Sequence, residues 1–317
     1  MSIFLLKIKI KNIFLSILFV LFIFFDLTRY FQKYNPFIDA KLIFPNTPAI
    51  EFLQKQPGLF RIGRLHREIL TPNTWIPYQL SSIEGYDPLG LENYARFFNR
   101  VNNNKYFDTI NRYTEIFSPD FKFLDALNVK YLLSVENDKN KISPYVKANK
   151  LELVFKDKST VIYKNPPALD RAYFVSETIT VDNKEKMAEI LDSPNFDPRT
   201  SAIILSSDSL PSLWSPGKVK INNYNDNNLT LETDNTEDRF LVLADTYDPG
   251  WQAYLDNQET KIYEVNGALR GIIVPKGNHQ IKMVYWPTSV DWGIKISLIS
   301  LFSLFVISLY NLIKKNW

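Results

Sequence analysis

Two long apolar segments, one near each end of the chain, constrain its fold more than any other feature. Residues 13–25 read IFLSILFVLFIFF, and residues 293–313 read GIKISLISLFSLFVISLYNLI. A helix needs about 20 mostly apolar residues to cross a bilayer, and the second segment meets this requirement. The first segment is shorter and is similar to the apolar region of a signal peptide, but no small-residue cleavage site follows it. We therefore expect an uncleaved membrane anchor at residues 1–27 and a transmembrane helix at residues 291–317.

Lysines around these segments predict how the chain crosses the membrane. Positive charge is enriched on the cytoplasmic side of membrane proteins. Five lysines flank the segments on their outer sides: Lys7, Lys9, Lys11, Lys314 and Lys315. We therefore expect both termini to be cytoplasmic and residues 28–290 to lie outside. Trp286 and Trp292 are typical of the membrane–water interface. The lipid bilayer is thus the first predicted partner.

The composition excludes several classes of function for the middle of the chain. The net charge of +3 arises at the ends, where residues 1–25 and 293–317 hold six Lys and no acidic residue, leaving 31 basic and 34 acidic residues between them. This balance provides no basic surface for nucleic acid, so that partner is excluded. The chain has no Cys, and its two histidines, His66 and His279, are far apart. We therefore predict no metal site and no cofactor.

Residues 28–200 combine helix and strand patterns, which predicts a mixed α/β exterior domain. Four capping signatures predict helix starts: Thr47 before Pro48, Asp87 before Pro88, Ser118 before Pro119, and Asp182 with Glu185. Four stretches rich in β-branched and aromatic residues predict strands: Val129–Val135, Leu151–Phe155, Thr160–Tyr163 and Ala172–Val175. The sequence Asp157-Lys158-Ser159 favours a turn that joins the second and third of these strands as a hairpin.

Residues 201–290 change to an alternating apolar and polar pattern, which predicts an all-β sandwich next to the last helix. Strands are expected near eight positions: Ala202, Val219, Leu229, Phe240, Trp251, Lys261, Leu269 and Ile281. Asn266-Gly267 favours a type I′ turn, Asp256-Asn257 is a weaker turn signal, and Pro275-Lys276-Gly277 predicts a further turn. The predicted fold class is therefore membrane-anchored α+β, with a mixed α/β exterior domain, then a β-sandwich, flanked by one transmembrane helix at each end.

Four segments, in the same order, resemble the bacterial YfhO-like membrane protein family. They are IEGYDPLGLENYARFF from Ile83, VIYKNPPALDRAYFV from Val161, SPNFDPRTSAIIL from Ser193, and FLVLADTYDPGWQAYLDNQETKIYEVNGALRGIIVPKGNHQIKMVYWP from Phe240. The resemblance implies a polytopic GT-C-type glycosyltransferase that moves sugars from a polyprenyl-phosphate carrier onto cell-surface polymers of bacteria. The many-helix part of that family, where its essential acidic residue lies, has no counterpart here. The resemblance therefore implies location and context, and no catalytic residue.

Two loops combine aromatic and acidic side chains and are candidates for glycan contact: Tyr86, Asp87, Tyr247, Asp248 and Trp251. An exposed aromatic ring beside a carboxylate offers stacking and hydrogen bonding to a sugar. Asp87 is alternatively the N-cap of a helix. Trp251 is alternatively a core residue, because it begins an alternation with Ala253 and Leu255. Both alternatives stay open at this point.

Three hypotheses about the function of the chain are compatible with these observations. The leading hypothesis is the exterior C-terminal portion of a YfhO-like glycosyltransferase, present as a separate subunit or truncated copy, which binds a cell-surface glycan acceptor or a polyprenyl-phosphate sugar and works with a polytopic partner. The alternatives are a free-standing membrane-anchored glycan-binding module and a non-functional truncated copy. The chain is not expected to catalyse a reaction alone. Arg270 and Lys276 are expected to be surface cations, either near lipid phosphate or without a specific role.

Overall fold

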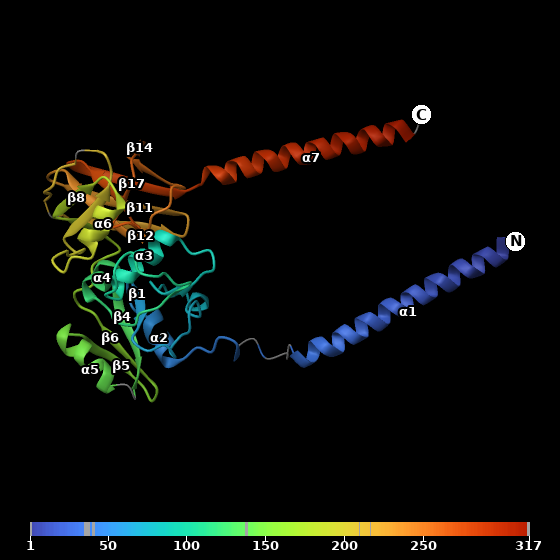
Figure 1. The fold of residues 1–317 in the computed structure, drawn as a ribbon, viewed down its shortest axis with the longest axis horizontal. Helices are drawn as coiled ribbons and strands as arrows, with labels where there is room; N and C mark the ends of the chain where they lie inside the picture. The colour runs from blue at the N-terminus through green and yellow to red at the C-terminus, as the bar shows by residue number, and fades with distance from the viewer. Residues whose placement is uncertain are drawn as a thin grey trace. The chain divides into compact units, whose positions relative to one another are not determined.

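A computed structural model describes residues 2–34, 39, 42–136, 139–208, 210–215 and 217–315. Met1, Asn316 and Trp317 of the predicted end segments therefore lie outside the described residues. The chain divides into two compact units, Met1–Thr47 and Pro48–Trp317. The first unit contains α1 (Ser2–Tyr34), and the second contains the sheet-rich body and α7 (Thr288–Lys315) (Figure 1).

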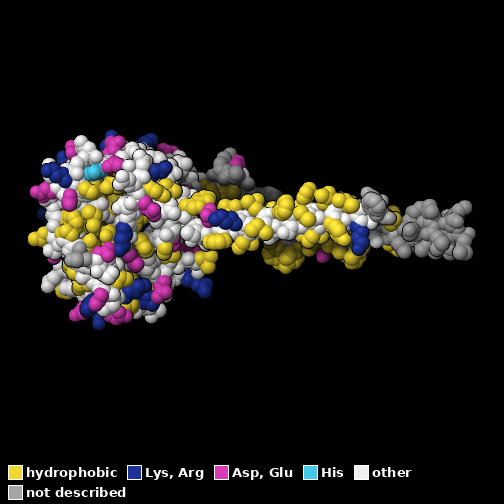
Figure 2. Space-filling model, turned by 90° about the horizontal axis from the view of Figure 1, so that it is seen from above, with side chains coloured by type: hydrophobic (Ala, Val, Ile, Leu, Met, Phe, Trp, Pro, Cys, Tyr) yellow, Lys and Arg dark blue, Asp and Glu magenta, His cyan; other side chains and the backbone are white. Residues whose placement is uncertain are grey.

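Helices α1 and α7 confirm the two apolar segments at the ends of the chain. Ile13–Gln32 and Thr288–Lys314 are long and apolar enough to cross a membrane, and neither span is buried inside the protein. Figure 2 shows hydrophobic side chains covering α7, with basic side chains near both of its ends. A helix that is apolar on every side is stable when lipid or protein surrounds it. The two helices therefore flank the body in sequence as expected.

The first half of the body contains a four-stranded sheet in the order β1-β4-β6-β5. Strand β1 runs parallel to β4, and the other two pairs are antiparallel. The elements of this half are α2 (Pro48–Gln54), β1 (Arg61–Arg64), the 3-10 helix η2 (Ile76–Tyr78), β2 (Gly85–Tyr86), α3 (Glu92–Val101), β3 (Tyr113–Thr114), α4 (Phe121–Ala126), β4 (Val129–Val135), α5 (Lys139–Ala148), β5 (Glu152–Lys156) and β6 (Thr160–Lys164). Strand β4 confirms the predicted range, β5 is shifted by one residue at both ends, and β6 is one residue longer than predicted. Ser159 N and Thr160 N donate to Asp157 Oδ1, which confirms the turn between them.

Two sheets face each other in the second half of the body, and together they confirm the β-sandwich. The five-stranded sheet has the order β10-β11-β17-β13-β14, and the six-stranded sheet has the order β7-β12-β16-β15-β9-β8. A core that includes Leu231, Leu241 and Ile281 fills the space between them. The strands are β7 (Ala172–Val175), β8 (Glu177–Val181), β9 (Ser201–Leu205), β10 (Val219–Asn225), β11 (Asn228–Asn235), β12 (Arg239–Thr246), β13 (Trp251–Leu255), β14 (Gln258–Thr260), β15 (Tyr263–Val265), β16 (Leu269–Val274) and β17 (Gly277–Tyr285).

The six-stranded sheet joins the two halves of the body. It takes β7 and β8 from before residue 200 and its other four strands from after it. Helix α6 (Lys184–Leu191) connects the parallel strands β8 and β9, as a crossover between parallel strands requires. Side chains of α3, α4 and α6 share one apolar core with this sheet, including Phe97, Leu124 and Met187. The division into domains at residues 27, 200 and 290 stays a prediction.

Three predicted helix starts are wrong by a few residues. Helix α3 begins at Glu92, four residues after the Pro88 start expected from its capping signature, because the Asp87 side chain accepts a hydrogen bond from Leu89 N inside its own turn. The cap of α4 is Asp120, whose side chain accepts from Lys122 N. The cap of α6 is Asn183, whose side chain accepts from Lys186 N. In α4 and α6 a polar side chain close to the predicted one caps the helix, whereas the N-cap of α3 is Leu91, which makes no side-chain cap hydrogen bond.

The turn predictions have mixed outcomes. Asn266 and Gly267 adopt positive φ angles of 53° and 72°, which confirms the turn between β15 and β16. Asp256 and Asn257 also have positive φ angles and close the hairpin of β13 and β14. The segment Pro275-Lys276-Gly277 reverses the chain, but β16 and β17 belong to different sheets. It therefore connects the two layers of the sandwich rather than adjacent strands of one sheet.

Replacing Gly267 with Ala should destabilise the body. The added Cβ would lie 2.6 Å from Tyr106 Oη and 2.8 Å from Met187 Cε, at a φ angle of +72°. Overpacking of this kind costs about 1–3 kcal/mol, so the unfolding midpoint of the full chain in detergent should fall. The control is Gly293→Ala in α7, where a Cβ meets nothing within 4 Å. Equal midpoints for the two variants would contradict the described packing.

Candidate functional site

A cleft of about 630 Å³ opens in the body where the first half meets the six-stranded sheet. The segment from Asn73 to Thr114 forms most of its lining, with Arg61 from β1 and Thr246 from β12 on another side. Cavities of about 300–1,000 Å³ are typical of small-molecule sites in proteins. The cleft is therefore large enough for a ligand of the size of a sugar.

An aromatic platform lies beside the cleft, with Tyr86 in the cleft lining and Tyr113 next to it. Tyr86 on β2 and Tyr113 on β3 pair across a two-stranded ribbon, and their ring centroids are 4.5 Å apart. Both rings are exposed. The Asn73 side chain holds the backbone of Tyr86, because its Nδ2 donates to Tyr86 O at 2.7 Å and its Oδ1 accepts from Tyr86 N at 3.2 Å. The platform is thus exposed but fixed in position.

Polar groups lie next to the platform. Asp87 follows Tyr86 directly, and its Oδ1 accepts from Leu89 N at 2.8 Å. Asp87 N donates to Arg112 O at 3.4 Å, which brings the segment containing Asn111 and Arg112 to the same side of the cleft. A carboxylate accepts hydrogen bonds, whereas a guanidinium and an amide donate them. The cleft mouth therefore offers both donors and acceptors beside an aromatic surface.

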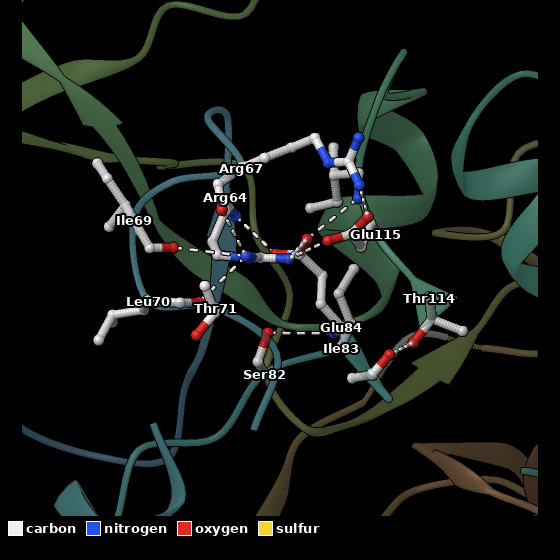
Figure 3. Close-up of polar contacts among 12 residues, drawn as sticks. Arg64, Arg67, Ile69, Leu70, Thr71, Ser82, Ile83, Glu84, Thr114 and Glu115 are labelled. Carbon is white, nitrogen blue, oxygen red and sulfur yellow. Dashed lines mark hydrogen bonds and ion pairs between the residues drawn. The ribbon is translucent and has the colours of Figure 1, made fainter. Parts of the chain in front are cut away.

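Glu84 lines the cleft and belongs to a buried ion network, which we call the floor (Figure 3). Arg64 Nη2 lies 3.0 Å from Glu84 Oε1 and 3.3 Å from Glu115 Oε1. Glu84 Oε1 also accepts from Ile116 N, and its Oε2 accepts from Arg64 N. Burial raises the pKa of the Glu84 carboxyl, against the opposing effect of Arg64 and the two amides. Because both of its oxygens are already used, Glu84 positions the floor rather than serving as an acid or base.

A second buried network connects the cleft to the sandwich. Arg61 Nη2 lies 2.8 Å from Asp245 Oδ1, Arg171 Nη1 lies 3.1 Å from the same oxygen, and Arg270 Nη2 lies 3.3 Å from Asp245 Oδ2. The Tyr224 hydroxyl donates to the same carboxylate. Burial acts to raise the pKa of Asp245, but the three guanidiniums together hold it below its ordinary value. We call these five residues the Asp245 cluster.

The second predicted loop lies outside the cleft. Trp251 is half-buried and packs against the core of the sandwich, and the Arg270 guanidinium lies 3.8 Å from its ring centroid. Asp248 Oδ1 accepts from Gly250 N within the loop. Of the two candidate groups, the structure places Tyr86 and Asp87 together in the cleft lining. The structure does not place Tyr247, Asp248 and Trp251 there, and for all five residues glycan contact stays a prediction.

The Asp245 cluster and the Arg64 network were not predicted from the sequence. Arg270 was expected at the surface, whereas only 3% of this residue is exposed. A signal was present in the sequence, because Asp245 follows the apolar run from Phe240 to Ala244. A charge in such a strand must find a partner when it is buried. The identity of the partners, however, cannot be inferred from one strand. Among the described residues, no group of three or more His, Asp or Glu side chains is arranged to hold a metal ion.

Comparison with known proteins identifies the last part of the chain. Residues 215–297 match the model of a family described as "Bacterial membrane protein YfhO". The C-terminal portion of this chain is YfhO-like. A YfhO protein of Bacillus subtilis (strain 168), named "Uncharacterized protein YfhO", is 30% identical over 79 residues. This match covers 25% of the present chain and 9% of that relative, so the chain spans a small part of the relative's length. No solved structure matches the chain.

The YfhO-like portion contains the five-stranded sheet, Asp245 and the beginning of α7. Most of the cleft lining, from Asn73 to Thr114, lies before it in the sequence. The Asp245 cluster therefore connects the YfhO-like portion to the preceding segments, in addition to the strand pairs of the six-stranded sheet, since Arg61 and Arg171 come from outside residues 215–297.

Replacing Asp245 with Asn should strongly destabilise the body, because three guanidiniums would lose their counter-charge. Breaking a buried ion pair costs about 3–5 kcal/mol. The low folded pKa of Asp245 adds stability that is present above the unfolded value of about 4 and is lost as the pH falls through the folded value. Unfolding of the full chain in detergent at pH 7 and at decreasing pH measures both effects. Asp226→Asn, in an exposed turn, is the control; a native-like midpoint for Asp245→Asn would contradict the cluster.

Proposed function

We propose that this chain is the extracytoplasmic C-terminal portion of a YfhO-like membrane glycosyltransferase. In this proposal it supports sugar transfer from a polyprenyl-phosphate carrier to a cell-surface polymer, and the catalytic many-helix core is a separate polytopic partner. The YfhO-like portion at residues 215–297 and the two apolar helices support the membrane context. The observation that carries the proposal is the cleft with its tyrosine platform.

The chemistry of the cleft mouth suits a saccharide. A sugar ring has apolar C–H faces and a circumference of hydroxyl groups. Aromatic side chains bury apolar area while their hydroxyl groups keep a polar contact. Tyr86 and Tyr113 therefore suit stacking with a sugar face, while Asp87, Asn111 and Arg112 suit its hydroxyl groups. The buried acid of the floor is held by Arg64, so the cleft is suited to binding rather than to bond cleavage.

The alternative function is a free-standing membrane-anchored glycan-binding module. It is favoured by the same observation, because the cleft is built entirely from residues of this chain. The two functions differ in whether the chain needs a polytopic protein partner. A polytopic protein that co-purifies with the chain from gently solubilised membranes supports the subunit, whereas glycan binding by the chain alone with no such partner supports the module.

The cleft should bind bacterial surface saccharides, and two substitutions should weaken that binding. We expect Tyr86→Ala and Asp87→Asn each to lower affinity about tenfold, which corresponds to about 1.4 kcal/mol. The measurement is binding of the full chain in nanodiscs to an array of cell-surface polysaccharide fragments, followed by titration of the fragments that bind. Tyr86→Phe should retain affinity, since the ring remains.

Two surface variants outside the cleft serve as controls: Leu153→Ala for lost apolar surface and Asp226→Asn for lost charge. Tyr86 and Asp87 are both exposed, so their variants should keep the unfolding midpoint of the parent chain. Binding of no saccharide, or equal binding by cleft and control variants, would reject the cleft as a glycan site.

The body should lie outside the cell, with both termini in the cytoplasm. The chain has no Cys, so single cysteines report their own location. In intact cells, a membrane-impermeant maleimide should label Asp226→Cys in the β10–β11 turn, whereas Lys314→Cys at the end of α7 should be labelled only after permeabilisation. Labelling of Lys314→Cys in intact cells would show that the topology is wrong.

A further inference from the structure

Large exposed apolar side chains lie in the cleft lining and directly next to it in the sequence. Leu89 is 88% exposed, the highest value for a large hydrophobic residue among the described parts of the chain. Ile76 and Leu91, which line the cleft, are also exposed. Soluble surfaces seldom gather such residues without a partner. The mouth therefore has the composition of a contact surface.

The turn that carries Leu89 is held in place by local hydrogen bonds. Leu89 N donates to Asp87 Oδ1 at 2.8 Å, and Gly90 N donates to Asp87 O at 3.2 Å. These bonds fix the turn from Asp87 to Gly90 with the leucine at its tip. The exposed side chain is thus presented by an ordered turn and does not result from local fraying.

The cleft wall connects directly to the base of α7. Thr246 lines the cleft, and Gly250 O, four residues later, accepts from Trp286 N at 2.9 Å. A Cβ on Gly250 would lie 2.9 Å from Pro287 Cβ, and α7 begins at Thr288. Four residues span at most about 14 Å. Figure 1 shows the loops next to α3 on the same side of the body as the end of β17. The cleft therefore lies close to the point where the chain enters the membrane.

We propose that the cleft mouth, formed by Ile76, Tyr86 and Leu91 together with the adjacent Leu89 and Tyr113, inserts into the outer surface of the lipid bilayer. The three aliphatic side chains fit the hydrocarbon boundary, and tyrosine rings are typical of the headgroup level. Exposed Arg112 beside them is suited to lipid phosphate. The mouth is then a second membrane contact besides α7, and the cleft opens along the membrane surface. This inference concerns the mouth in the absence of a saccharide, since Tyr86, Tyr113 and Arg112 are also the groups proposed to contact one.

The absence of Cys from the chain allows a direct test. Leu89→Cys in the full chain is labelled with an environment-sensitive fluorophore in nanodiscs, with and without lipids that carry a quencher at a shallow acyl position. We expect blue-shifted emission for this label and loss of most of its intensity to the quencher. The matched control is Leu213→Cys, because Leu213 is 77% exposed. It lies at the other edge of the body: Ser212, the residue before it, accepts a hydrogen bond from Thr178 N of β8, an edge strand of the six-stranded sheet. Its label should keep the emission of a water-exposed probe.

Two results would overturn the inference. Emission from residue 89 that matches the control would show that the mouth faces water. A blue shift without lipid quenching would show that protein covers the mouth, such as a second copy or a partner subunit. Ile76→Cys provides an independent position and should behave as Leu89→Cys does. Because no saccharide is present, the outcome is separate from the glycan-binding measurement.

Discussion

The ion pairs around Asp245 tie together parts of the body that are distant in sequence. Arg61 begins β1, Arg171 precedes β7, Arg270 lies on β16, and Tyr224 comes from β10 in the opposite sheet. A buried charge is costly unless it is paired, so burial of Asp245, Arg171 and Arg270 depends on their partners being in place. The four-stranded sheet and both layers of the sandwich are therefore coupled through one carboxylate.

Strand β1 extends this coupling to the cleft. Arg61 contacts Asp245 and also lines the cleft, while Arg64 on the same strand holds Glu84 and Glu115 beneath it. Tyr86 of the platform lies on β2, two residues after Glu84, so its position depends on that floor. The exposed and chemically varied mouth thus rests on two buried ion networks. This arrangement is suited to holding a ligand in a fixed orientation.

Local signals predicted much of the fold, and competition between local signals explains the errors. The apolar helices and the positive φ angles at Asn266 and Gly267 follow from short stretches of sequence, and both are confirmed. Asp87 was misplaced as a helix cap because its side chain can bond its own turn as readily as a helix end. The turn predicted at Pro275 connects strands of different sheets, because turn residues specify a reversal and not the sheet that the next strand joins.

The sequence by itself determined the membrane attachment and the alternating strands next to α7, since hydropathy and periodicity are properties of neighbouring residues. It also indicated Tyr86 and Asp87 as candidate contacts, although not the cleft around them. Only the tertiary structure decided the cleft and the Asp245 cluster. Arg61 and Asp245 are 184 residues apart, and their meeting depends on how whole sheets pack. Long-range contacts of this kind have no local pattern, because each partner shows only a charge that must be satisfied.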